Sequence, residues 1–294
     1  MLTVDPKETP IPQLHQYLVG AVAPRPIAFV STVDETGHPN LAPYSFFNVF
    51  SSNPPTLVFS SNRRVKNNTT KDTLSNVQQT REVVINVVTY QIVRQMAVAS
   101  IQYPKEVSEF EKSGLTPIAS DLIRPFRVQE SPVQMECKVK DIIPLGTEGG
   151  AGHLIICEIV RMHISDAVLD EKGRISPHKI DLMGRLGRAY YVRASGESIH
   201  TIVQPVDRIG IGYDQLPTSI LNSDVLTGNN LGALAGLQHP PKEADILELK
   251  KQPYIQALLK SPTPLEDLHT YAQREMNKDN IEFAARIAWL GEYL

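Results

Sequence analysis

Up to about residue 205, the chain alternates short apolar runs with polar turns, which is the pattern of β-strands. Apolar and β-branched residues fill 26–33, 56–60 and 81–88, and proline, glycine or polar residues flank each run. Runs of this length and composition predict buried strands. Two longer runs, 132–143 and 153–169, predict a pair of long antiparallel strands. The four glycines between these two runs predict a connection with conformational freedom.

Helical spacing interrupts the strand pattern twice. Apolar residues recur every three or four positions over 90–99, and a helical pattern also covers 70–80. Residues 103–128 are charged and broken by prolines, so they predict a loop with short helical turns. Residues 40–51 mix small, aromatic and polar side chains, a mixture that is unusual for a core strand. It suits a surface that lies against a planar ligand.

Beyond Gln204-Pro205 the pattern becomes helical, so we predict two parts, 1–205 and 206–294. Thr263, followed by Pro264, is the predicted N-cap of one helix, and Asp279 is the predicted cap of the last. The second part is predicted as a connector over 206–223, a loop or helix start over 226–232, and helices over 242–260, 264–277 and 279–293.

This pattern gives the helical extension few apolar residues. Its single tryptophan, Trp289, lies on a stripe with Ile281, Ala285 and Ala288. Small units bury a low fraction of their surface and are marginal alone. We therefore expect the extension to pack on the first part or on a dimer. A self-sufficient three-helix module is the alternative.

The composition narrows the classes of partner. The 294 residues include 29 basic and 32 acidic ones, a formal net charge of −3, and no basic stripe is interleaved with aromatics. Nucleic acid is therefore not an expected partner. The apolar runs are too short for a membrane span, and the first residues lack a signal-peptide pattern. Cys137 and Cys157 lie in apolar runs and predict reduced core thiols of a cytoplasmic protein.

An anion site is predicted where the strand over 56–60 ends and the helix over 70–80 begins. Ser60, Ser61 and Arg63 stand at the first position, and Lys71 and Thr73 at the second. Hydroxyls, a lysine and free backbone N–H groups at a helix start suit a phosphate. Taken alone, Lys71 and Thr73 would also fit an ordinary helix start with a solvated lysine.

Motifs for other chemistries are missing from the sequence. It has no Ser-His-Asp order, HExxH, CxxC or GxGxxG motif, so it predicts no hydrolase, no metal site and no Rossmann nucleotide site. His153 follows the glycine-rich connection and is the titratable group of most interest. His163 is interpreted as structural, and Asn86 needs a hydrogen-bond partner if it is buried.

Three segments together resemble the flavin reductase-like family. They are PRPIAFVST (24–32), NLAPYSFFNVFS followed by a proline pair, and the serine-rich strand end before Lys71-Asp72-Thr73. REVVINVV, the strand that begins with His153, and GRLGRAYY match further along, so the resemblance covers roughly residues 14–200. It implies a mainly β fold, an FMN-binding split β-barrel with flanking helices, here followed by an α-helical C-terminal extension.

The resemblance also implies roles for residues. It places Ser60, Ser61, Lys71 and Thr73 around the FMN phosphate and ribityl chain, with Arg63 near them. The segment beside the isoalloxazine is implied to contribute Ser45, Phe46 and Asn48, and alternation allows only one of Phe46 and Phe47 to face the ligand. Further implied neighbours of the flavin are Ser31, Thr32, Arg185 and Tyr191, and His153 is implied to position the nicotinamide or the flavin.

The sequence therefore predicts an FMN-binding oxidoreductase, a homodimer by resemblance, in which NADH or NADPH reduces the flavin. The electrons would pass to flavin, to a small-molecule acceptor or to a redox partner protein. One alternative is an FMN-bound electron carrier, similar to flavoredoxin, without appreciable NAD(P)H oxidation. Another is a non-enzymatic binding module whose barrel has lost its ligand; the intact SFFN and KDT segments argue against it.

Overall fold

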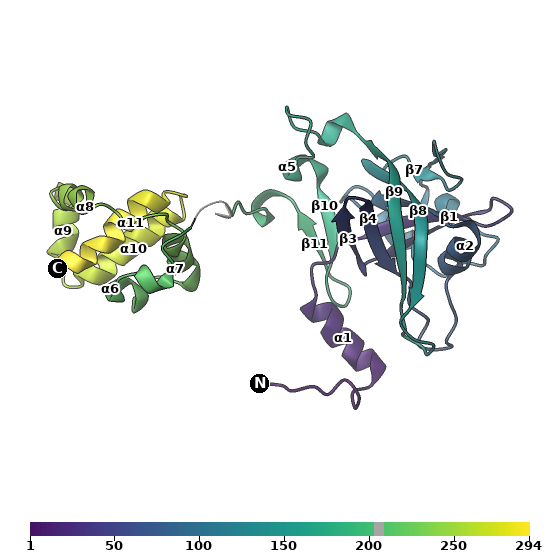
Figure 1. Cartoon of the computed structure of the whole chain (residues 1–294), viewed down its shortest axis with the longest axis horizontal. Helices are drawn as coiled ribbons and strands as arrows, with labels where there is room; N and C mark the ends of the chain where they lie inside the picture. Colours follow the sequence, from purple (N-terminus) through teal and green to yellow (C-terminus); the bar gives the residue numbers. More distant parts are fainter. Residues whose placement is uncertain (203–208) are drawn as a thin grey trace. The chain divides into compact units, whose positions relative to one another are not determined.

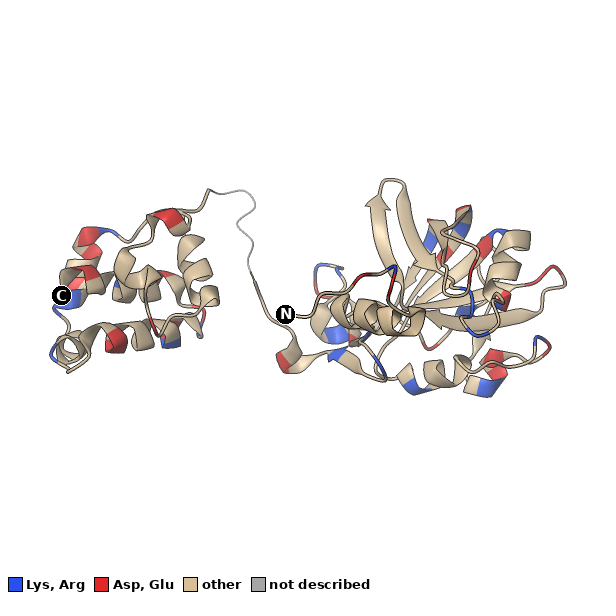
Figure 2. Cartoon of the chain, turned by 90° about the horizontal axis from the view of Figure 1, so that it is seen from below, with Lys and Arg blue, Asp and Glu red and all other residues tan. Residues whose placement is uncertain are grey.

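The computed structural model describes residues 1–202 and 209–294, which belong to two compact units, Met1–His200 and Thr201–Leu294 (Figure 1). The predicted boundary after residue 205 lies outside the described residues. Acidic and basic positions occur together on both units (Figure 2). Among the described residues, no helix is long and apolar enough to cross a membrane.

The first unit is built on one antiparallel sheet of seven strands, in the order β2-β1-β5-β8-β9-β4-β3. The longest two strands, β8 and β9, form the long hairpin in Figure 1. The strands are β1 (Ala28–Val33), β2 (Pro39–Tyr44), β3 (Phe47–Ser52), β4 (Pro55–Ser60), β5 (Glu82–Val87), β8 (Val133–Pro144) and β9 (His153–Ile164).

The sheet closes on itself at one corner. Strands β2 and β3 stand at opposite ends of the strand order, yet only Ser45 and Phe46 separate them in the chain. The three steps from Tyr44 to Phe47 span at most about 11 Å, so the two ends of the sheet must curl together at this point. The backbone N–H of Ser60, at the end of β4, donates to the carbonyl oxygen of Phe46 at 2.8 Å and fixes the corner. The result is the predicted split barrel.

Two apolar cores explain why β1 is buried along its whole length. Ala28 and Val30 belong to the barrel core with Phe59 and Ile155, whereas Phe29 packs on the other face, in a cluster with Phe110. The helices and short elements of this unit are α1 (Ile11–Ala21), α2 (Asp72–Thr80), α3 (Val93–Ala99), α4 (Glu109–Ser113), β6 (Pro117–Ile118), β7 (Arg127–Val128), η1 (Asp166–Val168), α5 (Pro177–Ile180), β10 (Leu182–Arg185), β11 (Tyr191–Ala194) and η2 (Gly196–Ser198).

Most predicted elements of this unit are confirmed, with differences at their ends. The segment over 40–51 is two strands rather than one, because the chain turns the barrel corner at Ser45 and Phe46. The strand predicted over 153–169 ends at Ile164, since Ser165 caps the short helix η1 by accepting from the N–H of Ala167. Helix α1 has no counterpart in the sequence prediction.

The second unit has a core of its own, so its apolar inventory is larger than the sequence pattern indicated. Leu216 and Ile220, within the predicted connector, are buried in one cluster with Leu268 and Trp289. The docking of this unit on the barrel or on a partner stays a prediction. Its elements are η3 (Tyr213–Gln215), α6 (Thr218–Leu221), α7 (Gly228–Ala235), α8 (Glu243–Lys250), α9 (Pro253–Leu259), α10 (Pro264–Met276), α11 (Ile281–Trp289) and η4 (Leu290–Tyr293).

The helix ends in this unit match the predicted caps only in part. Thr263 is the N-cap residue of α10, as predicted, but its side chain makes no cap hydrogen bond. The N-cap of α11 is Asn280 rather than Asp279, which has a left-handed backbone with φ of 65°. Thr227 does cap α7, in a capping box with Asn230. The helix predicted over 242–260 divides before Pro253, as expected for a residue that cannot donate a backbone hydrogen bond.

Candidate functional site

A cleft of about 380 Å³ opens at the corner where the barrel closes. Such a volume lies in the range of small-molecule sites. Five predicted site residues line it together: Ser45 and Phe46 from the corner, Ser60 from the end of β4, Lys71 from the start of α2, and Arg185 from the end of β10. The other wall residues are His15, Gln16, Val19, Arg25, Pro43, Tyr44, Asn62, Leu186 and Arg188.

Lys71 brings a partly buried positive charge to this cleft. Its Nζ lies 4.7 Å from the centre of the Tyr44 ring, and the side chain makes no hydrogen bond or ion pair within the described parts of the chain. Burial lowers the pKa of Lys71, and the charge of Arg64 lowers it further. Lys71 is also the N-cap residue of α2 and forms no side-chain cap there. An anion at this position would gain both the ammonium group and the helix N-terminus.

Three buried polar atoms in or next to the wall lack a partner within the described residues: Arg25 Nε, Tyr44 Oη and Ser61 Oγ. A buried polar atom without a hydrogen bond costs stability, so such atoms in a cleft indicate a ligand or water that satisfies them. Burial raises the pKa of Tyr44 to about 12, which keeps its hydroxyl a neutral donor. The donors and hydroxyls present therefore fit a phosphorylated, polar cofactor such as a flavin nucleotide.

Arg25 joins the cleft to two neighbouring elements. Its Nη1 donates to the carbonyl oxygens of Val19 (2.7 Å) and Val22 (2.5 Å) at the end of α1, and its Nη2 donates to that of Leu186 (3.1 Å). Cations at a helix C-terminus are favourable. The guanidinium also lies 5.9 Å from the centre of the Phe46 ring. Arg25 thus fixes α1 and the β10–β11 hairpin against the barrel corner.

The predicted glycine-rich connection packs behind the cleft. A Cβ on Gly152 would lie 2.5 Å from the Oγ of Ser60, and one on Gly149 would lie 2.9 Å from the carbonyl oxygen of Val65. The Oγ of Ser60 in turn donates to Asn62 Oδ1 at 2.9 Å. These close approaches require glycine, and they hold the end of β4 in place.

His153 lies behind the cleft rather than in its wall. The residue is 8% exposed, and its Nδ1 lies 3.3 Å from the carbonyl oxygen of Ser61. The backbones of the same two residues exchange both hydrogen bonds, at 3.1 Å each. In the described chain, His153 can therefore act on a ligand through the strand end at Ser61, and its direct contact with a nicotinamide stays a prediction.

Two predicted flavin neighbours serve the interior instead. Thr32 Oγ1 accepts from the Nδ2 of Asn40 (3.1 Å) and of Asn76 (3.0 Å), and Thr73 Oγ1 accepts from Asn40 Nδ2 (2.9 Å). Both threonines are fully buried in this cluster, which fastens α2 to the sheet. Ser31 is also buried outside the cleft wall, because it points off a strand that is covered on both faces.

Three more predicted site residues point elsewhere. Asn48 is exposed on the edge strand β3, where its Oδ1 accepts from the N–H of Val49. Arg63 donates to the side chain and the carbonyl of Asn68, at 2.6 Å each, and thereby closes the loop before α2. Tyr191 lies under the Arg185 guanidinium, 4.5 Å from the ring centre, outside the cleft wall. Their assignment as flavin ligands has no support from this placement.

Other predicted positions are explained by the structure. Phe46 faces the cleft and Phe47 packs on the barrel core, as strand alternation requires. Asn86 donates to the carbonyl of Phe29 and accepts from the N–H of Val128, so its bonds are structural. Cys137 and Cys157 are free and buried, and burial raises both thiol pKa values.

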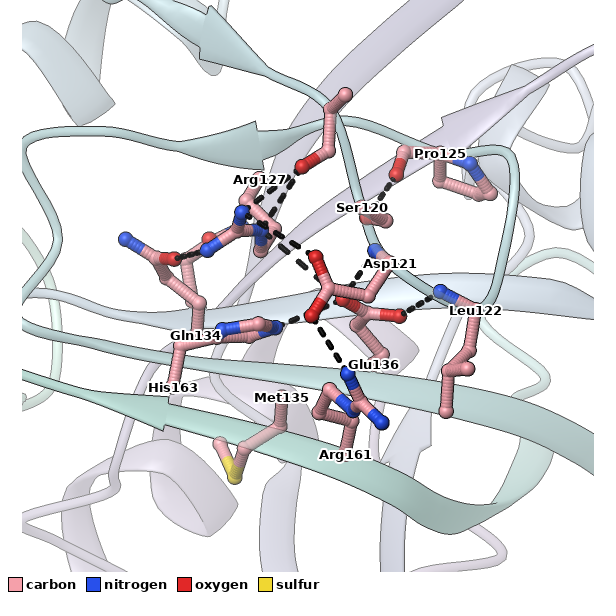
Figure 3. Close-up of polar contacts among 12 residues, drawn as sticks. Ser120, Asp121, Leu122, Pro125, Arg127, Gln134, Met135, Glu136, Arg161 and His163 are labelled. Carbon is pink, nitrogen blue, oxygen red and sulfur yellow. Dashed lines mark hydrogen bonds and ion pairs between the residues drawn. The ribbon is translucent and has the colours of Figure 1, made fainter.

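A second polar cluster lies on β8 and β9, where Asp121, Glu136 and His163 come within reach of a single ion (Figure 3). Glu136 is fully buried and accepts from the N–H groups of Asp121 and Leu122 and from His163 Nε2, all at 2.8 Å. These bonds lower its pKa even though burial raises it.

Two arginines already compensate the carboxylates of this cluster. Arg161 donates to Asp121 at 2.7 Å, and Arg127 lies within 4.0 Å of both acids (Figure 3). A metal ion would have to displace these charges, so the geometry supports a structural ion-pair network. His163 is structural, as predicted from the sequence.

Sequence reasoning missed several cleft residues, among them Arg25, Tyr44 and Arg188. Arg25 and Tyr44 stand inside segments that the sequence singles out, PRPIAF and NLAPYSFF. Their orientation depends on the corner at which the barrel closes, which no local pattern reveals. Arg188 lies in a hairpin loop that is held at the cleft by contacts of Arg25 with the backbones of Arg185 and Leu186, residues far from Arg25 in the sequence.

A closed antiparallel sheet with an acid-free, cationic cleft at its split defines a flavin-binding split barrel. Residues 20–182 match the flavin reductase like domain, so the chain belongs to that family. The helical unit lies outside this match.

Similar proteins share most of their own length with this chain. An uncharacterized protein of Aquifex aeolicus is 40% identical over 191 residues, 65% of this chain and 95% of that protein. Nitrilotriacetate monooxygenase component B of Bacillus cereus is 32% identical with a TM-score of 0.63, covering 68% of this chain and 98% of that one. The 2-nitrobenzoate 2-nitroreductase of Pseudomonas fluorescens is 28% identical with a TM-score of 0.62, covering 70% and 98%.

Proposed function

We propose that the chain is an FMN-dependent oxidoreductase in which NADH or NADPH reduces the flavin. The observation that carries the proposal is the cleft at the barrel corner. Within the described residues, Lys71 stands in this cleft without an anionic partner at the start of α2, and no acidic residue lines the cleft. A dianionic phosphate is the ligand that this arrangement favours most.

The anion site favours FMN over FAD. Lys71 and the first turn of α2 form one compact site, which suits a terminal monophosphate better than a pyrophosphate that continues to an adenosine. Ser60 and Asn62 stand beside it for the ribityl hydroxyls. Direct comparison of the two dissociation constants by fluorescence titration tests this preference.

Bound FMN supplies the capacity to accept a hydride and to pass electrons on. The contribution of this chain is alignment, because hydride transfer depends on stacking and distance more than on an acid or base. Arg25 and Phe46 meet at the corner and set the wall of the cleft. His153 supports the backbone of Ser61 from behind, and this is the positioning role that we assign to it.

The likeness to a monooxygenase component B and to a nitroreductase supports a redox role with a downstream acceptor, which is either a flavin, a small molecule or a redox partner protein. We also propose a homodimer. Edge strand β3 exposes Val49 (60%) and Phe50 (68%), and α1 exposes Leu18 and Val22, which leaves apolar surface for a second subunit. Free, buried Cys137 and Cys157 are consistent with the reducing cytoplasm.

The test is the absorption spectrum of the purified protein, followed by anaerobic titration with NADH and with NADPH. We expect a flavin spectrum that bleaches with one equivalent of nucleotide. Retained FMN without nucleotide oxidation would instead establish the electron carrier. A colourless protein that does not take up added FMN or FAD would overturn the flavin proposal altogether.

A further inference from the structure

A second chamber, of about 550 Å³, adjoins the cleft and has a different character. It lies between α1 and the loop of the β10–β11 hairpin, and its wall is almost entirely apolar. Gln16, Leu186 and Arg188 line both spaces, so the chamber lies directly beside the cleft. The residues that line the chamber alone are Tyr17, Gly20, Gly187 and Tyr190.

Two glycines leave this chamber open. Gly187 approaches α1 so closely that a Cβ there would lie 3.4 Å from the Cα of Gly20. A Cβ on Gly20 itself would have nothing within 4 Å. The space beside Gly20 is therefore bounded by the rings of Tyr17 and Tyr190 and by Leu186. Flat aromatic faces with aliphatic neighbours favour a planar, apolar ring.

Arg188 adds one charge to this apolar wall. It makes no hydrogen bond or ion pair with any residue that the structure describes, and its backbone is left-handed, with φ of 54°. A non-glycine residue is held in that conformation at a cost. The hairpin loop fixes it: the N–H of Tyr190 donates to the carbonyl of Gly187, and that of Leu186 to the carbonyl of Tyr190.

The other cleft cations are committed. Arg25 donates to three backbone carbonyls, and Arg185 lies over Tyr191 and donates to the carbonyl of Tyr190. Lys71 is the cation at the proposed phosphate site. No carboxylate lines either space among the described residues. Arg188 is thus a cation without a partner in the described chain, at the border between the cleft and an aromatic chamber.

We propose that this chamber is a second binding site for a planar aromatic carboxylate, whose ring packs between Tyr17 and Tyr190 and whose carboxylate pairs with Arg188. The inference rests on the proposed function, because the chamber adjoins the proposed FMN cleft. It adds the class of organic ligand that binds beside the flavin. Arg–carboxylate pairing is favoured by the fork geometry of the guanidinium.

Benzoate is the probe, measured by isothermal titration calorimetry on the full-length protein with and without FMN. Benzamide has the same ring without the charge, and acetate has the charge without the ring. We expect benzoate to bind at least tenfold more tightly than either. Equal binding of benzoate and benzamide would overturn the pairing with Arg188, and equal binding of benzoate and acetate would overturn the aromatic chamber.

Two variants localise the site. Arg188→Gln should reduce benzoate affinity tenfold or more, while Arg94→Gln, a change at an exposed arginine on α3, is the matched control and should bind benzoate and FMN like the wild type. Gly20→Leu has room for its side chain and should fold, but it should abolish benzoate binding by filling the chamber.

Three results contradict the proposal. Loss of FMN rather than benzoate in Arg188→Gln would assign Arg188 to the flavin phosphate. Wild-type benzoate binding in Gly20→Leu would place the ligand elsewhere. A changed oligomeric state in Gly20→Leu, without benzoate binding to the wild type, would make the chamber a subunit contact. If the wild type does not bind FMN, that result contradicts the proposed function and not the benzoate site.

Discussion

Replacing Lys71 by alanine tests the anion site most directly. The side chain has no partner within the described chain, and it contacts the Tyr44 ring at 4.7 Å. Its removal therefore breaks no hydrogen bond or ion pair of the free protein. The variant should fold as well as the wild type, and the effect should be confined to ligand binding.

The size of the effect follows from the kind of interaction lost. A hydrogen bond to a charged group contributes about 1.5–3 kcal/mol, which corresponds to a loss of roughly ten- to a hundredfold in FMN affinity. Burial already disfavours the ammonium in the free protein. The phosphate therefore gains an interaction that water weakens little, which favours the upper part of the range. The N-terminus of α2 and the charge of Arg64 account for the binding that remains.

Lys71 also predicts a pH dependence. Its pKa is lowered in the free protein by burial, and a bound dianionic phosphate would raise it again. The complex then holds more protons than the separate components once the pH exceeds the lowered pKa of the free protein. FMN affinity should fall as the pH rises through that value. In Lys71→Ala this decline should disappear.

Fluorescence titration of the apoprotein with FMN, repeated from neutral to alkaline pH, measures both effects. Lys66→Ala, a change at an exposed lysine in the preceding loop, is the matched control and should bind FMN like the wild type. Unchanged FMN affinity in Lys71→Ala would remove Lys71 from the phosphate site. If Lys71→Ala and Lys66→Ala weakened FMN binding to the same extent, the loss would reflect only a long-range charge effect.

Three further predictions concern stability and positioning. Glu136→Ala should lower the free energy of unfolding by roughly 3 kcal/mol in urea denaturation, at the lower end for a broken buried pair, because Arg127 retains Asp121. Since the pKa of Glu136 is lowered, its wild-type contribution should be present above the ordinary carboxyl pKa and be lost as the pH falls through the lowered one. His153→Ala should slow anaerobic flavin reduction in stopped-flow while FMN stays bound; reduction at the wild-type rate would refute the positioning role. Residues 201–294 should melt cooperatively as an isolated fragment, given the core around Leu268 and Trp289; a fragment that is unfolded by circular dichroism would favour the docking that the sequence indicated.

The strands of the barrel could be predicted because each carries its signal locally. Val83, Val84 and Ile85 alternate between the two faces of β5 and are all buried, and β1 is likewise covered on both faces. The meeting of Ser60 and Lys71 was predictable for the same reason, because a strand end and a helix start are both visible in sequence. Lys71 and Ser60 accordingly lie in one cleft.

Residues that depend on closure of the sheet were not predictable. Thr32 and Thr73 look like ligand hydroxyls in sequence. Once α2 packs on the barrel, the side-chain amides of Asn40 and Asn76 donate hydrogen bonds to these hydroxyls. Arg25 stands between two prolines and shows no periodic signal. Its hydrogen bonds to backbone carbonyls nevertheless join α1 and the β10–β11 hairpin to the barrel corner. The core of the helical unit was underestimated because Leu216 and Ile220 lie in short helical turns that have no repeating pattern.

The location of the cleft follows from the topology rather than from the overall charge. The protein carries a net charge of −3, yet no acidic residue lines the cleft or the adjoining chamber within the described chain. The barrel corner brings the start of α2, the end of β4 and the β10–β11 hairpin together, and these elements contribute Lys71, Ser60 and Arg185 to one cleft. Lys71, a partly buried cation without an anionic partner in the described chain, and the Tyr44 hydroxyl, a buried group without a hydrogen bond there, both cost stability. An anionic cofactor that satisfies them should therefore stabilise the first unit as well as react there, and the rise in its melting temperature should follow the FMN concentration.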